Sequence, residues 1–205
     1  MPDSMPWPPM AGAVIPITQE LLIGVALGFV VRVAIAVPEM VGDLISPVIG
    51  LGAAQAFDPV LGGSHGEIGR MLRYLAVFLA LVTGVHRVLL QALLSSFRVL
   101  APATDLRVAR VLPEIMDMVA ASIVDALRIG LPIISILFMI QVALAFISRA
   151  APAMQIFNVG FTVTLSVGLL LLIVLMPDLG RGFLFELSRV GTRTEGVLMA
   201  LGAGS

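Results

Sequence analysis

The sequence has 205 residues, of which 59% are hydrophobic and 12% charged, and its mean hydropathy is +1.09. A water-soluble domain carries about 25% charged residues, so this chain has too few polar side chains to cover a surface that faces water. The net charge of −1 excludes a strongly basic nucleic-acid-binding face, and the absence of cysteine excludes disulfides and thiol chemistry. We therefore expect an all-α membrane protein with a single domain over residues 1–205.

Four apolar segments stand out along the chain. A helix that crosses the hydrocarbon core of a bilayer needs about 20 apolar residues, and each segment approaches or reaches that length. The pattern predicts a multi-pass protein made of helical hairpins. Its expected spanning segments are Leu21–Val37, Tyr74–Leu94, Ala126–Ile147 and Met154–Met176.

The first segment contains a GxxxG pattern formed by Gly24 and Gly28. Small residues at this spacing allow two helix backbones to approach closely in a membrane. Gly160 and Gly168 create similar small faces in the fourth segment. We interpret these four glycines as helix-packing positions, which favours assembly over catalysis.

The segment Pro38–Gly69 is rich in glycine and proline and almost uncharged around its centre. Glycine allows backbone conformations that other residues avoid, which suits an irregular linker. Such a linker is either an ordinary exposed loop or irregular backbone at membrane depth, which persists only where it is buried in protein or lines a cavity. The residues alone leave these two alternatives open.

Several charged side chains lie inside the apolar segments: Arg32, His86, Arg87, Asp125 and Arg128. A charge at the bilayer centre costs at least about 2.5–3.5 kcal/mol, so each must reach the interface, find a partner, or face protein or water. Asp125 and Arg128 are spaced i,i+3, which predicts an ion pair on one helix face. The alternative is a proton or ion relay.

The arginines between the segments also bear on orientation. Basic residues accumulate on the cytoplasmic side, which here predicts a cytoplasmic position for both termini and for a loop over residues 95–123. The arginines assigned to that side are Arg98, Arg107, Arg110, Arg181, Arg189 and Arg193, against Arg70, Arg73 and Arg149 on the other.

The residues for common catalytic or metal sites are missing. The only histidines are His65 and His86, and neither belongs to an H-x-x-x-H pattern. Ser64 precedes His65 directly, but a nucleophile and its base must meet across space with a third group that orients the base. We therefore predict no catalytic, cofactor-binding or metal-ligating residues and a protein that is not an enzyme.

A short turn with Arg149 and Pro152 separates the last two segments. Proline at this position ends a helix, and an arginine before it is placed favourably near the helix C-terminus. With Phe157 and Phe161 these residues form the predicted hairpin turn.

Three stretches together resemble a known family. Residues 20–29 read ELLIGVALGF and resemble its E-L-L-I-G-x-A-L-G-F element, and residues 50–59 read GLGAAQAFDP and are similar to its G-L-x-x-A-x-x-x-D-P loop. Residues 149–161 read RAAPAMQIFNVGF and resemble its R-x-x-P-Q-M-x-V-F-x-V-G-F element. In this order, the stretches resemble the FliR family of flagellar biosynthetic proteins and its injectisome counterparts, the SctT-type export-gate subunits. The resemblance runs from Glu20 to Met176.

The resemblance implies a non-enzymatic subunit of the type III export gate, located in the bacterial inner membrane and, for flagellar members, in the flagellar basal body. Family members co-assemble with FliP-type and FliQ-type subunits, contact an FlhB-type switch protein, and form a closed pore for unfolded substrates. The family's plug falls on residues 50–66 of this chain. The implied gate or plug residues are Gly50, Leu51, Gly52, Phe57, Asp58 and Pro59.

The chain also departs from the family pattern. It begins where relatives have already passed a leading pair of apolar helices, and Ala53 and Ala56 stand at plug positions that are aromatic in relatives. In the hairpin turn, Ala153 and Thr162 replace the usual Gln and Pro.

The rival interpretation is a small secondary transporter or permease. It would place Arg32, Asp125 and Arg128 around a site at the midplane of the bilayer. Such a transporter predicts paired, broken helices in two related halves.

Overall fold

In the computed structural model, every described element is a helix. The structure describes residues 10–50, 66–99, 108–150 and 156–202. Its elements are α1 (Met10–Ile49), α3 (Glu67–Val82), α4 (Val85–Val99), α5 (Val108–Ala150), α6 (Ile156–Ser188) and α7 (Val190–Gly202). The predicted all-α class is confirmed.

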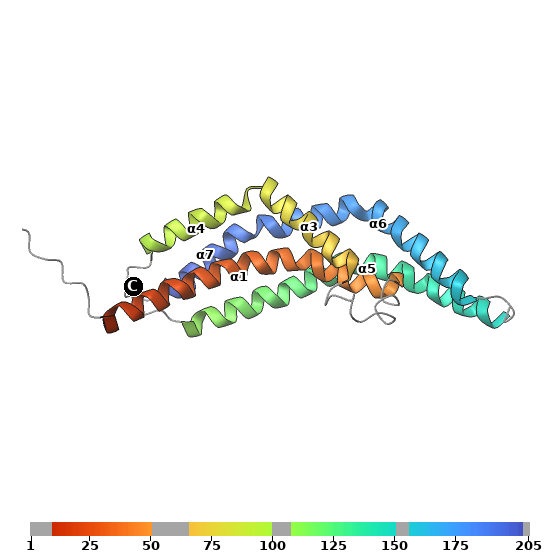
Figure 1. Cartoon of the computed structure of the whole chain (residues 1–205), viewed down its shortest axis with the longest axis horizontal. Coiled ribbons are helices and arrows are strands. Elements are labelled where there is room, and N and C mark those ends of the chain that lie inside the picture. The colour runs from red at the N-terminus through yellow and green to blue at the C-terminus, as the bar shows by residue number, and fades with distance from the viewer. Residues whose placement is uncertain (1–9, 51–65, 100–107, 151–155, 203–205) are drawn as a thin grey trace, which may run out of the picture.

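The helices form an elongated bundle in which direction alternates along the chain (Figure 1). The long helices α1 and α5 run one way, and the pairs α3–α4 and α6–α7 return beside them. α1 packs against α3 and α5 and therefore occupies the centre of the bundle. Each half of the chain thus consists of one long helix followed by a return made of two shorter helices.

α1 is much longer than the predicted segment Leu21–Val37. It continues through Pro38 and Pro47 to Ile49, so the prediction of a linker from residue 38 was wrong at that end, and residues 67–69 likewise belong to α3. A proline inside a helix costs about 3 kcal/mol. Burial opposes this cost, because a stripe at four-residue spacing is completely buried, and transmembrane helices tolerate proline. The stripe is Val37, Val41, Ile45 and Ile49.

The second predicted segment, Tyr74–Leu94, is two helices instead of one. α3 ends at Val82, α4 begins at Val85, and their axes differ by 64°. Gly84 has φ +80°, a left-handed conformation that ends a helix and that glycine adopts without steric cost. The backbone N–H of Thr83 donates to the carbonyl of Leu79 at 2.8 Å, which completes the last turn of α3.

The predicted loop over residues 95–123 is mostly helical. α4 extends to Val99, and α5 begins at Val108 and runs for 43 residues to Ala150. The third segment, Ala126–Ile147, is therefore only the second half of a helix that includes Pro113 and Pro132. The predicted cytoplasmic position of this loop stays a prediction, and the helices extend into the range 95–123 from both sides.

α6 and α7 extend the fourth segment beyond its predicted end at Met176. α6 passes through Pro177 to Ser188, and α7 continues from Val190 to Gly202. The turn between α5 and α6 lies outside the described residues, yet the two helices pack antiparallel on either side of it. The predicted helical hairpin is confirmed.

The buried apolar side chains form two clusters along the bundle. One includes Ile23 to Ala34 of α1 together with residues of α4 and α7, and the other includes Val37 to Ile49 with residues of α3 and α6. α6 passes from the second cluster at Phe183 to the first at Leu187, and the buried Glu186 lies between these two residues. Charged side chains therefore lie where the two cores meet.

Within the described ranges, three helical stretches are long and apolar enough to cross a membrane, and there are four if the bent pair α3–α4 counts as one. The stretches Ile17–Ile49, Arg110–Ile147 and Gly160–Gly202 have 33, 38 and 43 residues. Each exceeds the roughly 20 residues that a bilayer requires. Many large apolar side chains on them are exposed, including Phe138, Met139 and Ile173 at 62–72%, as expected for helices that meet lipid or other proteins.

Candidate functional site

The structure fixes both ends of the glycine-rich linker on the last turns of α1. Gly50 ends α1 with φ +98°, and its N–H donates to the carbonyl of Pro47 at 3.1 Å. A Cβ at Gly50 would lie 3.2 Å from the ring of Phe161 in α6. A predicted plug residue and a predicted hairpin residue are therefore neighbours.

The α5–α6 hairpin holds the end of α1 through two further contacts. The side chain of Gln141 in α5 donates to the carbonyl of Val48 at 2.9 Å. On α6, Gly168 lies against the buried side chain of Ile49, with 2.6 Å between the Ile49 Cγ1 and the position of a Cβ at Gly168. The missing side chain of Gly168 thus creates the space that Ile49 occupies.

The other end of the linker is fixed by α1 and α3. The N–H of Gly66, the N-cap of α3, donates to Oδ1 of Asp43 at 3.0 Å. One turn further on, Gly42 and Gly69 bring the backbones of α1 and α3 together, because a Cβ at Gly42 would lie 2.5 Å from the Cα of Gly69. A small-residue contact of this kind allows two helices to cross closely.

The described residues thus place the two anchors of the linker within the last third of one helix. Between the anchors lie residues 51–65, which are outside the described residues. Five of the six predicted plug residues fall there, namely Leu51, Gly52, Phe57, Asp58 and Pro59.

The other predicted residues have different surroundings. Gly24 and Gly28 are exposed on α1, and a Cβ at either would meet no described atom within 4 Å. Their GxxxG face is therefore not covered by the described helices. Gly160 lies near Leu144, whose Cδ1 is 3.9 Å from the position of a Cβ at Gly160, and Arg149 is exposed in the last turn of α5. Pro152 and the side chain of Phe157 lie outside the described residues.

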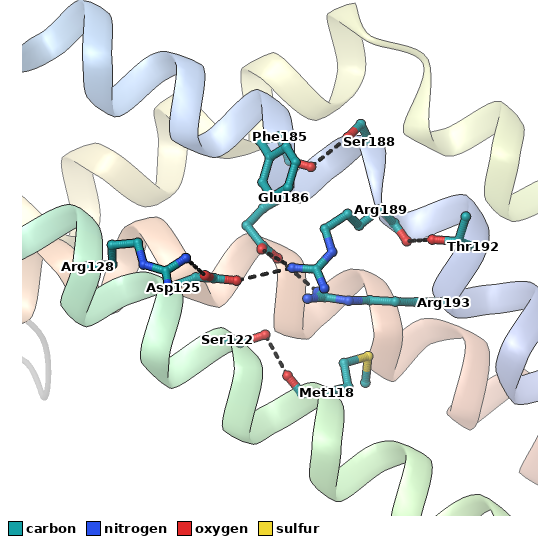
Figure 2. A network of polar contacts seen from close by, with 10 residues as sticks. All are labelled: Met118, Ser122, Asp125, Arg128, Phe185, Glu186, Ser188, Arg189, Thr192 and Arg193. Carbon is teal, nitrogen blue, oxygen red and sulfur yellow. Dashed lines mark hydrogen bonds and ion pairs between the residues drawn. The ribbon is translucent and has the colours of Figure 1, made fainter.

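A network of charged side chains joins α5, α6 and α7 (Figure 2). Asp125 of α5 accepts from Arg189 at 3.2 Å and lies 3.7 Å from Arg128. Glu186 of α6 is only 1% exposed and accepts from Arg193 at 2.8 Å and from Arg189 at 3.3 Å. The guanidinium of Arg189 thus bridges the two carboxylates, and the predicted Asp125–Arg128 pair is confirmed as the outer part of this network.

A second group of charges surrounds Glu39, whose side chain is 4% exposed. Arg32 donates to its Oε2 at 3.0 Å and Arg73 of α3 to its Oε1 at 3.5 Å. The arrangement ties α1 to α3 close to the linker. Removing one member of a buried ion pair leaves a buried charge without compensation and costs about 3–5 kcal/mol.

Sequence reasoning missed the buried acids Glu39 and Glu186. The available signal was spacing: Arg32 precedes Glu39 by seven residues, and Arg189 and Arg193 follow Glu186 by three and seven. In a continuous helix these spacings would place each set on one face. Among the described residues, no group of three histidine or carboxylate side chains is arranged to hold a metal ion.

The transporter interpretation placed Arg32, Asp125 and Arg128 around one site. In the structure, Arg32 contacts Glu39, while Asp125 and Arg128 contact each other and Asp125 contacts Arg189. The pairs of Arg32 and of Arg128 lie within one helix each, and the contact of Asp125 with Arg189 joins α5 to the end of α6. Among the described helices, a bend of 64° breaks the return at α3–α4, whereas Gly160–Gly202 of α6 and α7 is one apolar stretch, so the paired breaks that a transporter predicts are not both present.

Comparison with known proteins agrees with the resemblance found in the motifs. Residues 1–190 match the family described as bacterial export proteins, family 1. The flagellar biosynthetic protein FliR of Pectobacterium carotovorum subsp. carotovorum is 34% identical over 159 residues, covering 78% of this chain and 61% of the relative.

Two further relatives have the same name. FliR of Escherichia coli (strain K12) is 31% identical over 159 residues, covering 78% of this chain and 61% of the relative. FliR of Bacillus subtilis (strain 168) is 26% identical over 167 residues, covering 77% of this chain and 62% of the relative. The chain thus spans about three fifths of the length of these relatives. Because the family match covers nearly all of the sequence, the chain belongs to family 1 of the bacterial export proteins.

Proposed function

We propose that this chain is a subunit of the type III protein export gate in the bacterial inner membrane, where it contributes to a gated pore for unfolded flagellar proteins. The observation that carries the proposal is the double anchoring of the glycine-rich linker. Its first anchor is Gly50 against Phe161, and its second is the hydrogen bond from Gly66 to Asp43. A segment fixed at both ends on a helical frame suits a plug.

The gate works through packing and exclusion of water. Leu51 and Phe57 are the large apolar side chains of the predicted plug, and apolar constrictions close a pore by excluding water and ions. Pro59 fixes its own φ and biases Asp58 away from helical conformations, which supports a turn on the way out of the plug.

The proposed partners are FliP-type and FliQ-type gate subunits and an FlhB-type switch protein, with the flagellar basal body as the location. Support comes from surfaces that the described helices leave uncovered. The GxxxG face of Gly24 and Gly28 is open, and an apolar groove of about 270 Å³ between α1, α5 and α7 is lined by residues such as Phe29 and Leu112. Uncovered apolar surfaces of this kind mark contacts with protein or membrane.

The proposal is tested by ion leakage through the assembled gate. Replacing Phe57 with Ala, or deleting residues 50–52, should raise membrane permeability to small ions in cells that contain the complete gate, because the constriction loses apolar contact. Phe78→Ala on the exposed face of α3 serves as the control for loss of a phenylalanine. Unchanged leakage with intact assembly would exclude the plug assignment.

A further inference from the structure

Within the network of α5, α6 and α7, one positive charge is poorly compensated. Among the described residues, the network contains three guanidinium groups (Arg128, Arg189 and Arg193) and two carboxylates (Asp125 and Glu186). Glu186 and one oxygen of Asp125 are engaged by Arg189 and Arg193 at 2.8–3.3 Å. Arg128 lies 3.7 Å from Asp125, beyond hydrogen-bond distance, so the surplus charge resides on Arg128.

Arg128 points out of the bundle at a place where a charge is costly. Its side chain is 77% exposed, and it lies about 30 Å from either end of α5 at 1.5 Å per residue. The residues one turn to either side, Val124 and Leu131, are apolar and each 51% exposed. A charge on such a face is stabilised by a partner within hydrogen-bond distance, and Asp125 at 3.7 Å does not provide one.

The surface beside Arg128 is hollowed. A groove of about 230 Å³ runs between Pro132 and Ile133 of α5 and Leu175 and Leu179 of α6, with the side chain of Arg128 at its edge. Asp178 also lines the groove, but Arg181 neutralises it at 3.0 Å. The groove therefore offers an apolar floor next to one surplus positive charge.

We infer that this groove, which we call the Arg128 groove, is the docking site for an apolar helix of a neighbouring gate subunit that carries one Asp or Glu level with Arg128. The positive charge of Arg128 favours a partner helix with an acidic residue. A partner carboxylate would accept hydrogen bonds from Arg128 at a distance that Asp125 does not reach. The inference rests on the proposed function, because the partner is another subunit of the export gate.

A lipid phosphate is the competing occupant, and the surroundings favour protein. Headgroup regions collect Trp and Tyr as well as basic residues. Neither α5 nor α6 contains Trp or Tyr. The nearest other arginines on α5, Arg110 and Arg149, are 18 and 21 residues away, or about 27–32 Å along the helix. Arg128 therefore lies far along α5 from the positions where lipid headgroups would be expected.

The test compares Arg128→Gln with Arg70→Gln in the full chain, co-expressed with FliP-type and FliQ-type subunits. Both arginines are exposed, at 77% and 44%, and both pair i,i+3 with an acidic residue of their own helix, but Arg70 does not line the Arg128 groove. The yield of complex, measured by native mass spectrometry, should fall at least about tenfold for Arg128→Gln and less than about twofold for Arg70→Gln. Arg128→Lys should restore most of the yield.

Two further measurements keep the result interpretable. The isolated Arg128→Gln chain should unfold at the wild-type temperature, since Asp125 retains Arg189. A photo-crosslinker at Leu131 should capture a gate subunit, and capture of lipid alone would overturn the inference. Equal yields for Arg128→Gln and wild type, or equal losses for both glutamine variants, would also overturn it. Failure of the wild-type chain to assemble would refute the proposed function together with the inference.

Discussion

At the scale of single residues, glycines have two distinct roles in this chain. Gly42 and Gly69 allow α1 and α3 to touch through their backbones, whereas Gly24 and Gly28 face open space on the same α1. The sequence alone treats all of them as small residues in apolar helices. Only the packing of the bundle separates the internal contact from the external face.

This difference predicts opposite effects of the same substitution. Gly42→Ala should destabilise the purified chain by more than about 1 kcal/mol, because the new methyl group would lie 2.5 Å from backbone atoms of Gly69; overpacked sites cost about 1–3 kcal/mol. Gly28→Ala meets nothing within 4 Å and should raise stability by about 0.5–1 kcal/mol through helix propensity. Thermal unfolding in detergent measures both, and equal shifts would contradict the assigned contact.

In the proposed gate the open Gly28 face predicts a further effect. If a partner helix packs on it, Gly28→Leu should reduce the yield of complex at least about tenfold while leaving the isolated chain stable, because close helix contacts require small residues. Co-purification with the partner subunits measures the yield. Gly180→Leu is the control, since its site on α6 is also open, and a similar loss for both would show a general effect of added bulk.

At the scale of elements, sequence patterns located the helices better than their ends. The apolar segments around residues 21–37, 126–147 and 154–176 are parts of α1, α5 and α6, but each helix is longer than predicted. Pro38 and Pro47 lie in the predicted linker, and the buried stripe from Val37 to Ile49 opposes the cost of keeping them in a helix. The helix-breaking tendency of proline is a local property, whereas burial depends on which helices pack together. The burial of Glu39 and Glu186 also depends on that packing, so the sequence did not reveal it.

The break between α3 and α4 depends on the backbone of Gly84. Gly84→Ala should lower stability by about 1–2 kcal/mol, the cost of a left-handed conformation for a residue with a Cβ. A steric clash would not contribute to this loss, because the nearest atom to the new Cβ is Cδ of Arg87 at 3.8 Å. Gly84→Asn should cost less than Gly84→Ala, since asparagine tolerates this region. Chemical denaturation measures the series, and an equal cost for both would point to a different origin of the bend.

At the scale of the whole molecule, the directions of the helices determine which connections lie at the same end of the bundle. α1 and α5 begin at the end of the bundle where α4 and α7 finish, and the linker anchors and the α5–α6 hairpin lie toward the opposite end (Figure 1). The sequence anticipated this pairing of both termini with the connection after the second segment. It could not show that the linker and the hairpin meet through Gly50 and Phe161, since 111 residues separate them.

Single-cysteine labelling can test this arrangement directly, because these 205 residues contain no cysteine. Cysteines at Ser4, Thr104 and Ser205 should react with a membrane-impermeant maleimide from one side of the membrane, and cysteines at Ser64 and Ala153 from the other. The positive-inside rule expects the first group to be cytoplasmic. Labelling of Ser64 and Ser205 from the same side would contradict the alternation of the helices.

The attachment of residues 51–65 at Gly50 and Gly66 also limits how far the segment can reach. The 16 peptide steps between those two glycines span at most about 55 Å, so no point of the segment can travel more than about 28 Å from its attachments. Under the proposed plug function, a displaced segment would stay at a local concentration in the millimolar range relative to its resting place. Its return after each passing chain would then be a search over a few nanometres, at a speed independent of the number of gates in the cell.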